Sequence, residues 1–286
     1  MTRYAAVMEP DSTLRDLTLG FVGGGNMARS LIGGALEAGV PAACIRVGEP
    51  SPEQRARLEA DFGVACSDSN GDAVEGAEVV VLAVKPQVAA DAVRAITSRI
   101  DGHAVVVSIM AGIRTADLRR WLGVGPAIVR CMPNTPALIG FGMSALFAGP
   151  GLADADRARA AALLDAVGET VWVDDEAELD AVTAVSGSGP AYVFLFMEAL
   201  QAAGVAAGLP EATAAQLARQ TVRGAAEMAA AGADVGELRR QVTSPGGTTA
   251  AALAVLEAHG LRDAFARAVA AAAARSRELA DEFGGR

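Results

Sequence analysis

The sequence predicts an α/β protein, with a Rossmann-like, doubly wound N-terminal domain followed by an all-α C-terminal domain. Short apolar runs alternate with helical patterns over the first part of the chain. Such alternation is typical of βαβ units, which build a parallel sheet with helices on both faces. A glycine-rich turn at Gly23–Gly25 follows the first apolar run. After Asp174 no convincing strand pattern remains, so we expect the second domain to be helical.

Length and composition favour two domains. The chain has 286 residues, which is long for one compact core. We expect a dinucleotide-binding domain over residues 18–172 and a helical substrate-binding and dimerisation domain over residues 173–286. Apolar residues make up 52% of the sequence and aromatic residues only 4%, so small aliphatic side chains dominate the core. They let helices approach closely, which favours a helical interface between subunits.

Charge and cysteine content disfavour several classes of function. The formal net charge of −10 argues against nucleic-acid binding, which needs clustered Lys and Arg. Cys44, Cys66 and Cys131 lie far apart, so we expect reduced thiols in the cytoplasm, with no disulfide framework and no metal site. No apolar run in the sequence reaches the roughly 20 residues of a membrane span, so we expect no membrane association. The start of the chain, to Leu17, lacks an apolar signal core, and we expect a loose tail there.

The elements of the first domain follow from the apolar runs. The first strand is Leu19–Val22, and a helix extends from Asn26 to about Ala38. Ser51 and Pro52 supply the N-cap and first-turn proline of the next helix. The other expected strands cover residues 45–48, 79–84, 104–109, 127–132 and, as a short last strand, 169–173.

The second domain contains helical patterns only. Residues 190–207 are apolar on almost every face, which predicts a helix buried between subunits. Leu209 and Pro210 open another helix. A last helix pair covers about residues 248–283, with a break near His259 and Gly260.

The glycine turn has the pattern of a dinucleotide fingerprint. Gly23 permits a tight turn, and Gly25 lets main-chain amides approach a pyrophosphate. Asn26 and Met27 open the helix, and Ala28 allows close packing of the helix on the strand. An ordinary glycine-rich turn is the alternative.

The second strand gives conflicting signals about the cofactor. Glu49 is suited to a ribose diol, which favours NAD, and would repel a 2′-phosphate. Ser51, at a helix N-terminus, and the nearby Arg55 and Arg57 favour a phosphate. The choice between NADPH and NADH stays open at this point.

Residues at the end of a later strand should border the nicotinamide. Ala83, Val84, Lys85 and Pro86 leave the carboxyl edge of the predicted sheet, where ligands bind in doubly wound folds. For Lys85 the alternative is a solvated lysine at the end of the strand.

A polar loop interrupts the alanine-rich second half. It contains Ser244, Pro245, Gly246, Gly247, Thr248 and Thr249. Hydroxyls and unhindered amides at a helix N-terminus form an anion site, so we expect this loop to hold a small carboxylate. Alternatively, its threonines are the N-cap of the next helix.

Taken together, five motifs resemble pyrroline-5-carboxylate reductases, over about Leu19 to the C-terminus. The motifs are Gly20–Ala28, Ala83–Pro86, Met132–Pro136, Ser186–Phe194 and Ser244–Thr249, in matching order and spacing. This resemblance implies NAD(P)H-dependent reduction of 1-pyrroline-5-carboxylate to L-proline, the last step of proline biosynthesis. NADPH is the expected cofactor, with NADH possible.

The resemblance also implies roles for single residues. Thr249 would bond the ring nitrogen and act as proton donor, with Ser244, Gly246, Gly247 and Thr248 holding the substrate. Asn134 would lie near the nicotinamide, Asn70 would touch the adenosine end, and Glu176 would reach the substrate. The residues alone leave two alternatives: a plain turn between the domains for Asn134, and a surface loop, which the sequence favours, for Asn70. The family implies a homodimer, assembled into a larger homo-oligomer, with the active site between the domains.

Two alternatives have different consequences. A β-hydroxyacid dehydrogenase would carry a catalytic lysine in its helical domain, and no lysine occurs between Asp174 and Arg286. A nicotinamide-binding regulatory protein without catalysis would not need the Ser244–Thr249 loop.

Overall fold

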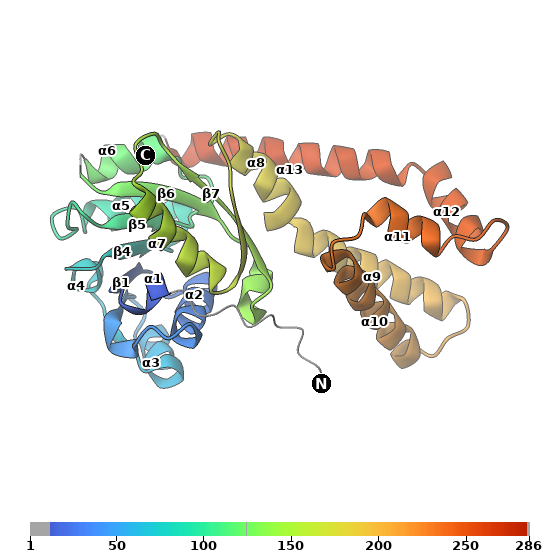
Figure 1. Ribbon diagram of the computed structural model, residues 1–286, viewed down its shortest axis with the longest axis horizontal. Helices are drawn as coiled ribbons and strands as arrows, with labels where there is room; N and C mark the ends of the chain where they lie inside the picture. Colours follow the sequence, from blue (N-terminus) through green and yellow to red (C-terminus); the bar gives the residue numbers. More distant parts are fainter. Residues whose placement is uncertain (1–11, 124, 285–286) are drawn as a thin grey trace. The chain divides into compact units, whose positions relative to one another are not determined.

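The computed structural model describes residues 12–123 and 125–284, which form two compact units (Figure 1). The first unit extends to Gly187 and takes in the end of the chain from Ala272; the second is Ser188–Ala271. The sequence predicts a boundary after residue 172, where the last strand ends, whereas the contacts keep the segment up to Gly187 with the first unit. The functional boundary at residues 172 and 173 stays a prediction.

One eight-stranded sheet organises the first unit, in the order β3-β2-β1-β4-β5-β6-β7-β8. All neighbouring strands are parallel except β6 and β7, which are antiparallel. The order of the first six strands is that of a Rossmann fold, whose strand order reverses between β1 and β4. The strands are β1 Leu19–Val22, β2 Ile45–Gly48, β3 Ala65–Ser67, β4 Val79–Leu82, β5 Val105–Ser108, β6 Ala127–Met132, β7 Gly142–Ala148 and β8 Gly168–Trp172.

Helices cover both faces of this sheet, which confirms the predicted fold class (Figure 1). Because β1, β4 and β5 are buried on both faces, their side chains enter two separate cores. The helices α1 Ser12–Arg15, α2 Asn26–Glu37, α3 Pro52–Phe62 and α7 Asp154–Asp165 cover one face. The helices α4 Asn70–Val74, α5 Ala89–Arg94, α6 Thr115–Leu122 and the end of α13 Leu261–Gly284 cover the other. Four short elements, η1 Ala42–Cys44, η2 Pro86–Val88, η3 Thr135–Ile139 and α8 Glu178–Val182, connect these parts of the first unit.

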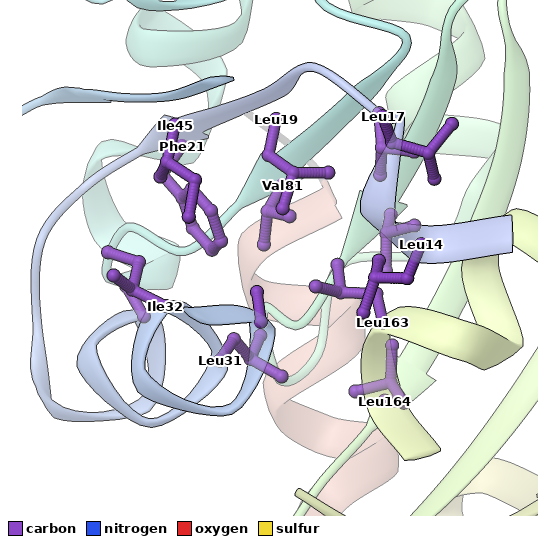
Figure 2. Close-up of a cluster of buried hydrophobic side chains, with 14 of the residues drawn as sticks. Leu14, Leu17, Leu19, Phe21, Leu31, Ile32, Ile45, Val81, Leu163 and Leu164 are labelled. Atoms are coloured by element: carbon purple, nitrogen blue, oxygen red, sulfur yellow. The ribbon is translucent and has the colours of Figure 1, made fainter. Parts of the chain in front are cut away.

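The start of the described chain is part of the core. Leu14 in α1 is 1% exposed and Leu17 is 5% exposed. Figure 2 shows Leu14 beside Leu163 of α7, in the cluster that also contains Leu17 and Leu164. The expectation of a loose tail up to Leu17 is therefore wrong for residues 12–17, because Leu14 and Leu17 are both buried in the larger core. Residues 1–11 lie outside the described residues.

Two strands were not expected from the sequence. β3 has only three residues and pairs only with β2 among the described strands. β7 contains Gly142 and Ser144 and therefore lacks a continuous apolar run. It pairs in parallel with β8 where Gly168 adopts a φ of +155°, and a Cβ at Gly168 would lie 2.0 Å from the carbonyl oxygen of Gly142.

The second unit is helical throughout its described residues. α9 follows a π-helical turn, η4 Thr183–Gly187, and is apolar yet exposed in the described chain: Phe194 is 59% and Leu195 65% accessible. By length and composition alone, the segment Glu178–Ala206 could cross a membrane. The break near Gly260 between the last two helices is confirmed. The helices are α9 Gly189–Ala206, α10 Glu211–Ala230, α11 Val235–Gln241, α12 Thr248–Ala258 and the first part of α13.

Candidate cofactor and substrate sites

The glycine turn after β1 lies where the strand order reverses. Gly23 has a φ of +98°, and its amide donates to the carbonyl of Gly48 at the end of β2 (2.8 Å). A Cβ at Gly23 would lie 2.9 Å from the carbonyl oxygen of Ala83. A side chain at Gly23 would therefore be strained and would meet the chain that leaves β4.

The N-terminus of α2 is open to a ligand. Gly25 is its N-cap, no side chain caps it among the described residues, and a Cβ at Gly25 would meet nothing within 4 Å. The amides of Asn26 and Met27 therefore lack a side-chain partner, as at sites where a helix N-terminus binds phosphate. Ala28 is fully buried against the sheet. These features fit the pyrophosphate of a dinucleotide.

The carboxylate of Glu49 is held by the main chain on both sides. Its Oε2 accepts from the amide of Gly24 and its Oε1 from the amide of Ser51, each at 2.9 Å. Ser51 is the N-cap of α3, and its hydroxyl accepts from the amide of Gln54 (3.3 Å). Sequence reasoning named Glu49 but did not predict that it bridges the two loops.

Asn70 begins α4 and packs against the end of β2. Its Oδ1 is buried and has no hydrogen-bond partner within the described residues. A Cβ at Gly48 would lie 2.5 Å from this oxygen, so the close approach requires glycine. An orphaned acceptor here fits a hydroxyl donor from a bound ribose.

The chain that leaves β4 borders the glycine turn. Ala83 donates its amide to Val22 at the end of β1 (2.9 Å), and Val84 lies against Gly23. Lys85, next along, is exposed and precedes Pro86 at the start of η2. The structure thus brings Ala83–Pro86 to the same edge of the sheet as the fingerprint.

Asn134 lies in the turn after β6 and is an anchor within the first unit. Its Oδ1 accepts from the amide of Met143 in β7 (2.9 Å). Its Nδ2 donates to the carbonyl and the hydroxyl of Ser186, each at 3.2 Å. These bonds hold the turn in place, and contact between Asn134 and the nicotinamide stays a prediction.

Glu176 is also engaged within the first unit. Its carboxylate accepts from the amide (2.8 Å) and hydroxyl (2.7 Å) of Thr115, and from Nη1 of Arg130 (3.1 Å). The side chain of Arg130 is 7% exposed. This buried ion pair joins the start of α6 to β6 and gives Glu176 a structural role.

The polar loop of the second unit leads into α12. Gly246 has a φ of +71°, and Gly247 donates its amide to Ser244 O (3.0 Å), which closes a tight turn. α12 begins at Thr248 with Gly247 as N-cap and no side-chain cap. Thr248 and Thr249 are therefore the first helical residues, and the alternative that they are the N-cap is wrong. Their amides and hydroxyls remain available, and the loop is largely exposed.

Two cysteines of the first unit have raised thiol pKa values. Burial raises the pKa of the Cys131 thiol to about 12, and burial together with nearby Glu59 raises that of Cys66 to about 11. Both thiols therefore stay protonated near neutral pH. No group of three or more His, Cys, Asp or Glu is placed to hold a metal within residues 12–123 and 125–284.

Comparison with known proteins adds a further line of evidence. Residues 176–279 match the family model for pyrroline-5-carboxylate reductase dimerisation, and residues 18–112 match that for NADP oxidoreductase coenzyme F420-dependent. A pyrroline-5-carboxylate reductase of Pseudomonas aeruginosa is 49% identical over 267 residues, 93% of this chain and 98% of that protein.

Two solved structures are also similar. A pyrroline-5-carboxylate reductase of Coxiella burnetii matches with a TM-score of 0.87 and 39% identity, over 92% of this chain and 98% of that one. A pyrroline carboxylate reductase of Plasmodium falciparum, solved with NADP bound, matches with a TM-score of 0.82 and 29% identity, over 93% and 99% of the two chains.

Proposed function

This chain belongs to the pyrroline-5-carboxylate reductase family, and from that premise we propose how its residues carry out the reaction. The protein is an oxidoreductase that reduces the cyclic C=N bond of 1-pyrroline-5-carboxylate to give L-proline. NADPH, when bound, supplies the hydride. The residues described above bind the cofactor and the substrate, orient the ring against the nicotinamide, and protonate the ring nitrogen.

The residues at the carboxyl edge of the sheet hold the cofactor. The uncapped amides after Gly25 bind the pyrophosphate, and Gly23 lets the turn lie close to β4. Asn70 accepts from the adenosine ribose with its orphaned Oδ1. Ala83 to Pro86 border the nicotinamide half, with Asn134 beyond them.

The Ser244–Thr249 loop holds the substrate. The Gly246 and Thr248 amides, with the Ser244 hydroxyl, bind the carboxylate of the ring acid. Gly247 lines the same site through its bare backbone, because its own amide donates to Ser244 O and closes the turn. The Thr249 hydroxyl donates a hydrogen bond to the ring nitrogen and passes a proton to the amine that forms. The observation that carries this assignment is the start of α12, where the first amides have no capping side chain.

The helical unit makes the protein a dimer. The match to the dimerisation model covers residues 176–279 and so includes the exposed apolar face of α9. A partner subunit accounts for that face, and for the apolar segment Glu178–Ala206, without a membrane. The dimers assemble into a larger homo-oligomer, and the enzyme works in the cytoplasm.

A steady-state assay tests the assignment. The purified protein should oxidise NADPH only when 1-pyrroline-5-carboxylate is present. Thr249→Ala should lower kcat at least about tenfold, because a transition-state bond of about 1.5–3 kcal/mol is lost. Thr249→Ser, which keeps the hydroxyl, should recover most of the rate.

The matched control is Thr213→Ala, since Thr213 is an exposed threonine of α10. Its rate should equal that of the wild type. An unchanged kcat in Thr249→Ala would remove Thr249 from the mechanism. Cofactor binding without any turnover of the ring acid would refute the substrate assignment.

A further inference from the structure

We propose that Glu49 is the residue that sets the choice between NADPH and NADH. Its carboxylate occupies main-chain donors at the adenosine end of the cofactor site and thereby lowers affinity for a 2′-phosphate. The inference rests on the proposed function in one respect, because it takes the glycine turn to bind a dinucleotide. It concerns selectivity, which family membership leaves open.

Both carboxylate oxygens of Glu49 are in use. Oε2 accepts from Gly24 N and Oε1 from Ser51 N, each at 2.9 Å. These amides belong to two different loops, the glycine turn and the start of α3. Phosphate groups bind at sites where several main-chain amides point at one anion. The internal carboxylate and an incoming phosphate therefore compete for the same donors.

One further donor near Glu49, Nη1 of Arg55, is also engaged. Nη1 of Arg55 donates to the carbonyls of Glu49 (2.8 Å) and Pro50 (3.0 Å). Nη1 of Arg55 is therefore committed to main-chain carbonyls rather than to the paired bonds that Arg makes with phosphate. The side chain that the sequence suggested as a phosphate ligand thus stabilises the loop that presents Glu49.

A ribose diol and a 2′-phosphate meet this arrangement differently. An acidic residue after the second strand of a Rossmann fold accepts a hydrogen bond from the ribose 2′-hydroxyl. A carboxylate can accept that bond and keep its amides. A 2′-phosphate brings like charges together, so Glu49 must turn away and give up both amides. The charge of Glu49 is therefore a repulsive element that discriminates against the 2′-phosphate.

Binding of cofactor fragments to the full-length protein tests the inference without substrate. Calorimetry should compare ADP-ribose with its 2′-phosphorylated form on the wild type and on Glu49→Gln. The variant should bind the phosphorylated form at least about tenfold more tightly, since a nearby like charge is removed. Its affinity for ADP-ribose should change less than about threefold, because one amide acceptor remains.

Glu53→Gln is the matched control. Glu53 is exposed in the first turn of α3, the helix that follows the Glu49 loop, and the variant removes the same charge as Glu49→Gln. It should leave the ratio of the two affinities at the wild-type value. Glu49→Ser provides a second variant if Glu49→Gln folds poorly, and the ratio of kcat/KM for NADPH to that for NADH should rise in both Glu49 variants.

Each outcome has a distinct meaning. An unchanged ratio in the Glu49 variants, or an equal shift in Glu53→Gln, would overturn the inference. Failure of both fragments to bind the wild type would overturn the cofactor site and the inference together. A shifted ratio in a protein that does not reduce the ring acid would support the role of Glu49 and refute the substrate assignment.

Discussion

At the scale of single residues, Cys131 shows how burial alone controls a reactive group. The thiol lies in β6, just before the turn that contains Asn134, and is 2% exposed. Burial raises its pKa to about 12, against a smaller, lowering effect of the nearby Ser144 hydroxyl. The group is therefore a neutral core residue.

This shift makes stability depend on pH above neutrality. The folded-state pKa of Cys131 lies above its ordinary value of 9.0. Between pH 9 and 12 the unfolded chain loses the proton and the folded chain keeps it, so the free energy of unfolding falls as pH rises. The contribution reaches about 1.4 kcal/mol per pH unit.

Urea unfolding of the wild type and of Cys131→Ala at pH 8, 9 and 10, with reductant, measures how the free energy of unfolding depends on pH. The wild type should lose more stability than the variant between pH 9 and 10. Equal slopes would show that Cys131 does not keep its proton in the folded state.

At the scale of elements, α1 matters more than its four residues suggest. Its Leu14 packs against α7 in the larger core, beside Leu163 (Figure 2). Leu14→Ala should lower the free energy of unfolding by about 2–5 kcal/mol, through lost burial and a residual cavity.

Asp16→Ala, an exposed change in the residue that follows α1, is its control and should alter stability by less than about 0.5 kcal/mol. Chemical denaturation of the wild type, Leu14→Ala and Asp16→Ala measures their free energies of unfolding. Equal stability of Leu14→Ala and Asp16→Ala would mean that α1 adds nothing to the fold.

The elements also show what local sequence can predict. β1, β4 and β5 were predicted because each is one apolar run, and Gly23 because its turn follows such a run. β7 was missed because long-range pairing with β6 and β8 creates it. The bridge by Glu49 and the anchoring of Asn134 join residues far apart in sequence, so no local pattern reveals them.

At the scale of the whole molecule, the apolar surface of α9 calls for a second subunit. Leu195 is 65% exposed in the described chain, and the dimerisation match includes it. Leu195→Asp should weaken the dimer at least about a hundredfold, because a carboxylate would be buried without a partner. Light scattering after gel filtration should show a monomer at concentrations where the wild type has the mass of a dimer or of a larger assembly.

Ala56→Asp is a control that adds the same charge to an exposed position of α3, and it should leave the mass unchanged. If Leu195→Asp kept the wild-type mass, α9 would not lie in the interface.

The composition of the whole chain makes one position chemically unique. Lys85 is the only lysine in the sequence, and it is exposed beside the glycine turn, next to Val84, which contacts Gly23. Elsewhere arginine supplies the positive charge, whereas this position has a compact ammonium. An amine-acylating reagent should therefore modify one side chain only, besides the terminal amine.

Acetylation of Lys85 removes its charge at the edge of the sheet where we propose that the cofactor binds. Peptide mass spectrometry should locate the acetyl group at Lys85, and saturating NADPH should slow its addition. The modified enzyme should bind NADPH several-fold more weakly, while Lys85→Arg, which the reagent does not modify there, should keep its affinity after the same treatment. Complete acetylation with unchanged NADPH affinity would show that the ammonium lies outside the cofactor site.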